Sequence, residues 1–129
     1  PMTLVILNRL IESGKISLSD KLSKYIPDFP DGDKITIEML ARHRSGIQHR
    51  VMPAEMESVA YTSAEFVEKV KRVKLAFEPG TQRLYSSGGF SVLARCLEIA
   101  AGKSFAELLR EYVFNPAGMN DSVDFDGET

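Results

Sequence analysis

Two short clusters of residues in this sequence could carry out chemistry. The first, residues 40–47, contains a histidine, a serine and a glycine, and the second is residues 78–90. In the second cluster Tyr85 ends an extended stretch, and Ser86 or Ser87 can cap the helix that follows. A tyrosine at a helix N-terminus is placed to act as a general base, because the helix dipole favours its phenolate form. The alternative is a buried tyrosine beside a helix cap, which is a common arrangement, and the residues alone leave both interpretations open.

No complete motif of a common enzyme class accompanies these clusters. The segment Gly89–Leu93 begins like a Gly-x-Ser-x-Gly nucleophile elbow but lacks its final glycine. A phosphate-binding loop, His-Glu-x-x-His, Cys-x-x-Cys, Ser-x-x-Lys and Lys-Thr-Gly are all absent from the sequence. Two histidines and a single cysteine argue against a structural zinc site. The sequence therefore predicts neither a metal nor a cofactor.

Composition places the chain among ordinary globular domains. Its 129 residues are 43% hydrophobic and 26% charged, which is enough for one domain with a real core. The formal net charge of −2 argues against a nucleic-acid binder that works through a basic face. The longest apolar run, Leu4–Leu7, is too short for a membrane span. The single cysteine, Cys96, cannot form an internal disulfide and is expected in the core.

The spacing of apolar residues and capping signals predicts a mainly helical fold with long loops. Helices are expected over residues 2–12, 36–41, 62–70, 89–101 and 104–113. Residues 16–33 form an irregular connection with one short helical turn. No two segments form an obvious pair of strands.

Two of these elements bear on how the clusters are positioned. Apolar residues cover most of the circumference of the helix at residues 2–12, which indicates a buried helix. The helix at residues 89–101 is amphipathic, with Phe90, Leu93 and Leu97 on its apolar face. Between them, residues 47–61 form a loop of unusual length for a compact domain, and such loops are often part of a binding site.

Four segments, taken in order, carry a resemblance to a known family. Residues 40–47 are similar to a Leu-Leu-x-His-x-Ser-Gly-Leu motif, and residues 79–94 to Pro-Gly-x-x-x-x-Tyr-Ser-Asn followed by an apolar helix. Residues 14–27 are similar to a Gly-Lys-Leu…Lys-Tyr-Leu-Pro segment, and residues 116–119 to a closing Pro-Leu-Gly-Met turn. Over residues 1–122 the chain thus resembles the serine β-lactamase and penicillin-binding-protein-like family, in the branch of class C β-lactamases, D-alanyl-D-alanine peptidases and esterases.

The resemblance implies which part of that fold this chain represents. The family's Ser-x-x-Lys nucleophile motif would immediately precede Pro1, and its Lys-Thr-Gly or His-x-Gly motif would follow the chain. Residues 1–129 would then be a single helical subdomain of the β-lactamase/transpeptidase-like fold, without the α/β sheet part. Residues 121–129 are expected to be a poorly ordered tail. We expect the isolated chain to be inactive, because it lacks the nucleophile.

The same resemblance implies roles for individual residues. Tyr85 aligns with the catalytic tyrosine, which takes the nucleophile's proton and later returns one to the leaving group. Ser87 occupies a substrate-binding position where the family has asparagine, and a hydroxyl cannot offer the separate donor and acceptor of an amide. His43, Ser45 and Gly46 correspond to structural positions beside the site.

A second histidine, His49, has no counterpart in the family pattern, and we interpret it as a solvated loop residue. The implied activity is transfer of an acyl group from an ester, peptide or β-lactam to a serine, followed by hydrolysis. Implied partners are that substrate and the missing α/β part, or self-association, and the implied location is periplasmic or secreted. The alternative is a non-catalytic helical binding or interaction module that kept the scaffold. The residues just before Pro1 would discriminate between the two.

Overall fold

The computed structural model describes residues 2–49 and 63–114, and their regular structure is helical. The elements are α1 (Met2–Glu12), α2 (Leu22–Tyr25), η1 (Gly32–Lys34), α3 (Ile37–Ala41), α4 (Ser63–Val70), α5 (Ser87–Ala101), α6 (Phe105–Leu109) and η3 (Arg110–Phe114). The predicted tail, the predicted closing turn, most of the predicted long loop and Thr62, the first residue of the helix predicted at residues 62–70, lie outside the described residues.

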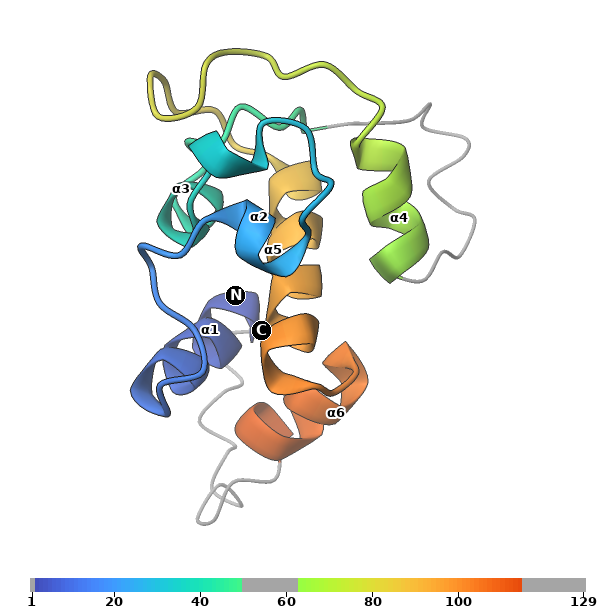
Figure 1. Cartoon of the computed structure of the whole chain (residues 1–129). Helices are drawn as coiled ribbons and strands as arrows, with labels where there is room; N and C mark the ends of the chain where they lie inside the picture. The colour runs from blue at the N-terminus through green and yellow to red at the C-terminus, as the bar shows by residue number, and fades with distance from the viewer. Residues whose placement is uncertain (1, 50–62, 115–129) are drawn as a thin grey trace.

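Helix α5 is the centre of the fold. Contacts join it to α1, α2, α3, α4 and α6, and Figure 1 shows α4 on one side with α1 and α3 on the other. Its buried residues are Gly88, Gly89, Val92, Leu93, Cys96 and Leu97. This buried face only partly matches the predicted apolar face. Leu93 and Leu97 are buried as predicted, but Phe90 is only half-buried, and Val92 also lies in the core. The reason is that α5 has neighbours on two sides, so its buried face is wider than a single apolar stripe.

The core location predicted for Cys96 is confirmed. Its side chain is fully buried, and burial raises the pKa of the thiol to about 12. A thiol with so high a pKa is almost entirely protonated at neutral pH and is a poor nucleophile. Cys96 therefore packs as a small apolar side chain.

Helix α1 spans the residues predicted for it. Ile6, Leu7 and Leu10 are buried, and the other apolar residues of this helix, Met2, Leu4, Val5 and Ile11, are partly buried against the same core. The polar positions Asn8 and Arg9 are exposed. The chain's own core thus covers part of every apolar residue of α1, and self-association of the chain stays a prediction.

Local signals in the sequence set several helix ends. The hydroxyl of Thr36 accepts a hydrogen bond from the Met39 N–H, and Ser104 and Glu107 form a reciprocal capping box before α6. Gly102 ends α5 with a φ of 70°, in the left-handed region that a C-terminal glycine favours. The helix predicted to run to residue 113 is continuous, but it changes from α to π hydrogen bonding at Arg110.

The connection between α1 and α3 has more order than the sequence predicts, since it contains α2 and η1 rather than one helical turn. An isolated antiparallel bridge pairs Lys21 with Thr36 and closes this connection into a loop. In the same connection between α1 and α3, the Asp20 carboxylate accepts hydrogen bonds from the Tyr25 hydroxyl (2.6 Å) and the Ser17 N–H (2.9 Å). The bond from Tyr25 is the main reason that the pKa of Asp20 is lowered. These contacts fix the segment that leads into α3 and the first cluster.

Candidate functional site

The two sequence clusters, far apart in the chain, lie against each other. The Leu84 N–H donates to the carbonyl of His43 (2.9 Å), and the Gly80 N–H donates to the carbonyl of Arg44 (2.7 Å). The Arg44 guanidinium also donates to the Gly80 carbonyl (2.9 Å). These backbone bonds hold the extended stretch before α5 alongside the segment after α3. The residues of both clusters therefore contribute to one site.

Ser86 fixes where Tyr85 points. Its backbone is extended, and its hydroxyl accepts a hydrogen bond from the Gly89 N–H (2.8 Å), which caps α5. The side chain of Ser86 is 2% exposed, whereas that of Tyr85 is 61% exposed. Neighbouring side chains point to opposite sides of an extended backbone, so burial of the cap turns the tyrosine outward. Tyr85 stands in the open at the N-terminus of α5, not in the core.

His43 supports Tyr85 from the buried side. Its Nδ1 accepts a hydrogen bond from the Ser86 N–H (3.0 Å), and its ring stacks on Phe90 at a centroid distance of 4.7 Å. The Tyr85 ring lies against the same imidazole, also at 4.7 Å. Burial lowers the pKa of His43, and the positive charge of Arg83 lowers it further. A neutral imidazole with Nδ1 as acceptor carries its proton on Nε2.

A second imidazole, His49, lies on the exposed side of Tyr85. Its Nδ1 accepts a hydrogen bond from the Ser87 N–H (3.0 Å), and its ring centroid is 5.2 Å from that of Tyr85. His49 is exposed and lies in a loop, as predicted, but its contacts with Ser87 and Tyr85 were not predicted. No local signal in the sequence could have shown these contacts, because they depend on how the loop after Gly46 returns to the start of α5.

The other two residues predicted to lie beside the site shape the turn beneath it. Ser45 is 1% exposed, and its hydroxyl accepts the Ile47 N–H (3.2 Å). Gly46 has a φ of 92°, and a Cβ at this position would lie 2.4 Å from the carbonyl oxygen of Phe77. Its own carbonyl accepts the Ala76 N–H (2.7 Å). Ser45 therefore holds the turn internally, and Gly46 anchors it to the segment that precedes α5.

Ser87 begins α5 and has an exposed side chain, directly after the buried cap. Tyr85, Ser87 and His49 thus share the exposed surface at the helix N-terminus, while His43 and Ser45 lie below it. A phenol, a hydroxyl and an imidazole held in this way can exchange protons with a bound molecule and form hydrogen bonds to it.

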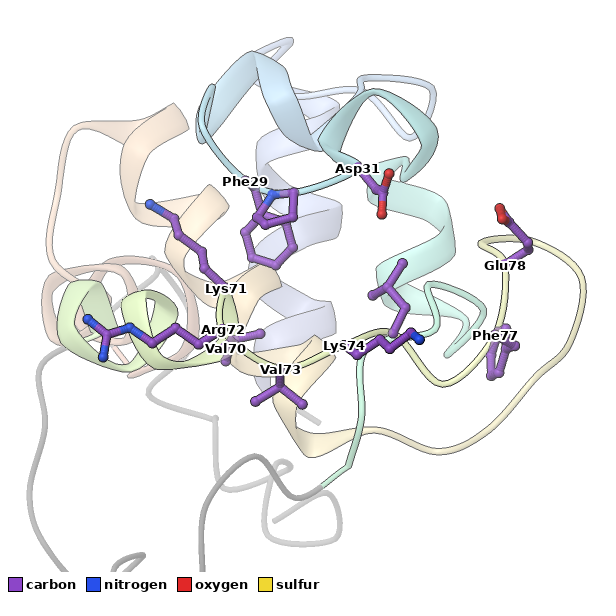
Figure 2. A pocket seen from close by; sticks show the side chains of 11 residues that line it. Phe29, Asp31, Val70, Lys71, Arg72, Val73, Lys74, Phe77 and Glu78 are labelled. Carbon is purple, nitrogen blue, oxygen red and sulfur yellow. The ribbon is translucent and has the colours of Figure 1, made fainter.

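A separate pocket of about 460 Å³ lies between the connection after α2 and the segment after α4, and its lining includes neither Tyr85 nor Ser87 nor either histidine. Figure 2 shows Phe29 and Asp31 on one side of this pocket, with Val73 and Lys74 on the opposite side. The Lys71 ammonium pairs with the carboxylates of Asp28 (2.8 Å) and Glu68 (2.6 Å) at the pocket's edge. These ion pairs tie α4 to the connection after α2.

Within residues 2–49 and 63–114, no three or more of the His, Cys, Asp and Glu side chains are grouped closely enough to hold a metal ion. In the same residues, no helix combines the length and the apolar character needed to span a membrane.

Comparison with known proteins gives a consistent result. The family model described as beta-lactamase matches residues 1–123. The chain is 34% identical over 138 residues to the D-alanyl-D-alanine-carboxypeptidase/endopeptidase AmpH of Escherichia coli, covering 95% of this chain and 34% of that protein. The crystal structure of a penicillin binding protein from Bacillus halodurans matches with a TM-score of 0.78 and 28% identity, over 90% of this chain and 37% of that one.

A further solved structure shares the fold at lower identity. The D-amino acid amidase from Ochrobactrum anthropi SV3 matches with a TM-score of 0.78 and 24% identity, over 91% of this chain and 33% of that one. In all these comparisons the chain spans only about a third of the length of the protein that it matches.

Proposed function

The chain belongs to the beta-lactamase family of serine hydrolases, and from that premise we propose that it forms the helical half of an acyl-transfer site in which Tyr85 is the general base. The other half, in this proposal, is an α/β part of a longer protein that carries the serine nucleophile. The coverage of about a third of each relative supports the division into two parts. The isolated helical half is expected to be inactive.

The placement of Tyr85 is the observation that carries the proposal. Its phenol is exposed, while its ring is held by His43 below and by His49 beside it. A side chain kept for packing alone would be buried, and a free surface tyrosine would not be bracketed by two fixed rings. An exposed phenol in a fixed position is what proton transfer to and from a bound molecule requires.

The proposed reaction has two halves that use the same phenol. As the serine oxygen attacks the substrate carbonyl, Tyr85 takes the serine proton and a tetrahedral intermediate forms. Collapse of that intermediate breaks the bond to the leaving group, which receives the proton from Tyr85 and leaves a serine ester. Water then attacks the ester, again giving its proton to Tyr85, and the serine leaves with a proton returned. A lysine of a Ser-x-x-Lys motif would favour the phenolate that begins the cycle.

The remaining site residues take supporting roles in this proposal. Ser87 contacts the substrate, because its exposed hydroxyl follows Tyr85 by two residues on the same surface. His43 holds the Ser86 backbone and the Tyr85 ring. Ser45 and Gly46 stabilise the turn that follows His43.

The relatives suggest a class of substrates without fixing one. The name of the Escherichia coli relative describes a carboxypeptidase and endopeptidase acting on D-alanyl-D-alanine, and that of the Ochrobactrum structure describes a D-amino acid amidase. We propose that the complete protein cleaves an ester or amide of a D-amino acid. Ser87 favours the ester, since a serine hydroxyl makes fewer hydrogen bonds to a substrate amide than asparagine does.

The proposal is tested by hydrolysis assays on the complete protein. A panel of D-alanyl-D-alanine peptide, N-acetyl-D-alanine p-nitrophenyl ester and a penicillin would be assayed, with the isolated chain as the control. We expect hydrolysis of the ester to be fastest, a covalent adduct of one acyl group detectable by intact mass, and no hydrolysis by the isolated chain. Hydrolysis by the isolated chain at the same rate would contradict the two-part site.

One observation favours a second candidate, a non-catalytic module that kept the helical scaffold. Ser87 replaces the asparagine of the family pattern, which is the kind of change expected once catalysis is lost. The exposed and bracketed Tyr85 argues the other way. Sequencing the segment before Pro1 separates the two, since a module that has lost catalysis need not keep Ser-x-x-Lys there.

A further inference from the structure

Consecutive backbone amides at the start of α5 are paired with two different histidines. The Ser86 N–H donates to Nδ1 of His43, and the Ser87 N–H donates to Nδ1 of His49, both at 3.0 Å. An acceptor nitrogen cannot carry a proton, so each neutral imidazole must be protonated on Nε2. The helix N-terminus thereby fixes the tautomer of both rings.

The two rings differ in what they can reach. His43 is buried and stacked on Phe90, so it has a structural position. His49 is exposed, and its ring lies beside that of Tyr85 at 5.2 Å. Because the two nitrogens of an imidazole point in divergent directions, the Nε2–H of His49 is directed away from the amide that holds Nδ1. The Nε2–H is therefore the hydrogen-bond donor that this ring has left for a ligand, and a molecule bound against the Tyr85 ring would have the His49 ring beside it.

We propose that His49 is a specificity-determining residue, whose Nε2–H donates a hydrogen bond to an amide carbonyl in the acyl part of the substrate. This inference rests on the proposed function, because it assumes that an acyl group binds at Tyr85. The ligand class is an N-acylated amino-acid ester or amide. A carbonyl oxygen suits the site because it accepts a hydrogen bond from a neutral imidazole and has a second lone pair for a hydroxyl such as that of Ser87.

Two matched substrates isolate this contact. N-acetyl-D-alanine p-nitrophenyl ester and p-nitrophenyl propionate have the same ester and the same carbon skeleton, and only the first carries the N-acetyl amide. Two variants isolate the donor. His49→Phe keeps a ring but has no nitrogen, and His49→Asn keeps an oxygen that can accept the Ser87 N–H while losing the donor in the Nε2 position.

In the complete protein we expect both variants to lower kcat/KM for the N-acetyl ester by about five- to tenfold, which is the usual effect of one neutral hydrogen bond. Any loss that comes from releasing the Tyr85 ring acts on both substrates, so the ratio of kcat/KM for the N-acetyl ester to kcat/KM for the propionate ester should itself fall by about five- to tenfold. An equal loss with both substrates, or a His49→Asn variant that matches the unchanged protein on the N-acetyl ester, would mean that His49 only holds the helix end, and would overturn the proposal.

A second measurement keeps this inference separate from the proposed function. The ¹⁵N chemical shift of His49 Nε2 is followed in the complete protein while N-acetyl-D-alanine, the product acid, is added. A saturable change expected for a new hydrogen bond supports the contact even if no ester is hydrolysed, in which case the proposed reaction fails alone. An unchanged Nε2 resonance at saturating ligand overturns the role of His49 even if hydrolysis is observed.

Discussion

Replacing Tyr85 by phenylalanine in the complete protein is expected to lower kcat by about 10²- to 10⁴-fold, the range that general acid–base catalysis contributes. The change removes only the phenolic oxygen, and the ring contacts with His43 and His49 can persist. Because the hydroxyl acts in the transition state, kcat and kcat/KM should fall together while KM changes little. Steady-state kinetics with an N-acetyl-D-alanine ester measures both.

A matched control is the same change at another tyrosine. Tyr112 lies in η3, which packs against α1 and α6 and follows the end of α5 opposite to the one beside Tyr85. Tyr112→Phe should leave kcat within about twofold of the unchanged protein. If Tyr85→Phe kept more than about half of the activity, Tyr85 would not be the general base.

The largest effect on stability is expected at Gly46. An alanine there must adopt a φ of 92°, and its Cβ would lie 2.4 Å from the Phe77 carbonyl oxygen, far inside contact distance. Strain from the positive φ costs about 1–3 kcal/mol, and moving the backbone apart would weaken the bond from Ala76 to the Gly46 carbonyl, worth about 1 kcal/mol. We expect Gly46→Ala to lower the free energy of unfolding of this chain by about 3 kcal/mol or more, measured by urea unfolding.

Gly14 offers the control for this prediction, because its φ is 76° and an added Cβ would meet nothing within 4 Å. Gly14→Ala therefore carries the backbone strain without the collision, and should cost about 1–2 kcal/mol. The difference between the two variants measures the contact of the turn with the Phe77 carbonyl. Equal losses would show that this contact has no role in holding the His43 turn in place.

The helices were largely predictable because their signals are local. The span of α1 follows from its apolar pattern, and the starts of α3 and α6 follow from the capping side chains of Thr36 and Ser104. The start of α5 was placed at Gly89, two residues late. Glycines discourage a helix by intrinsic propensity, but Gly89 lies in a crowded first turn, where a Cβ would be 3.1 Å from the Ser86 hydroxyl oxygen.

The site was predictable in its parts but not in its assembly. The positions of Tyr85 and Ser87 at a helix start follow from the sequence, and the family pattern joins His43 to them. The sequence does not show that the imidazoles of His43 and His49 accept hydrogen bonds from the consecutive N–H groups that follow Tyr85, nor that both rings lie against the tyrosine ring. That arrangement depends on the left-handed backbone at His43 (φ 60°) and on Gly46, which together turn the chain back towards α5.

The family assignment leaves the choice between an enzyme and a non-catalytic module to experiment. A match to the beta-lactamase model over residues 1–123 excludes an accidental resemblance. A scaffold that has lost its chemistry would share the same fold, so the choice between an enzyme and a binding module depends on the phenol of Tyr85. The Tyr85 phenol can act as a general base only if a serine oxygen lies within hydrogen-bond distance of it.

The most direct test is therefore a crystal structure of the complete protein acylated by an ester or a β-lactam. The quantity of interest is the distance between the phenolic oxygen of Tyr85 and the Oγ of the acylated serine. We predict about 2.6–3.2 Å, the hydrogen-bond range needed for proton transfer. A distance beyond about 6 Å, with another side chain hydrogen-bonded to the serine oxygen, would contradict the assignment of Tyr85 as the base.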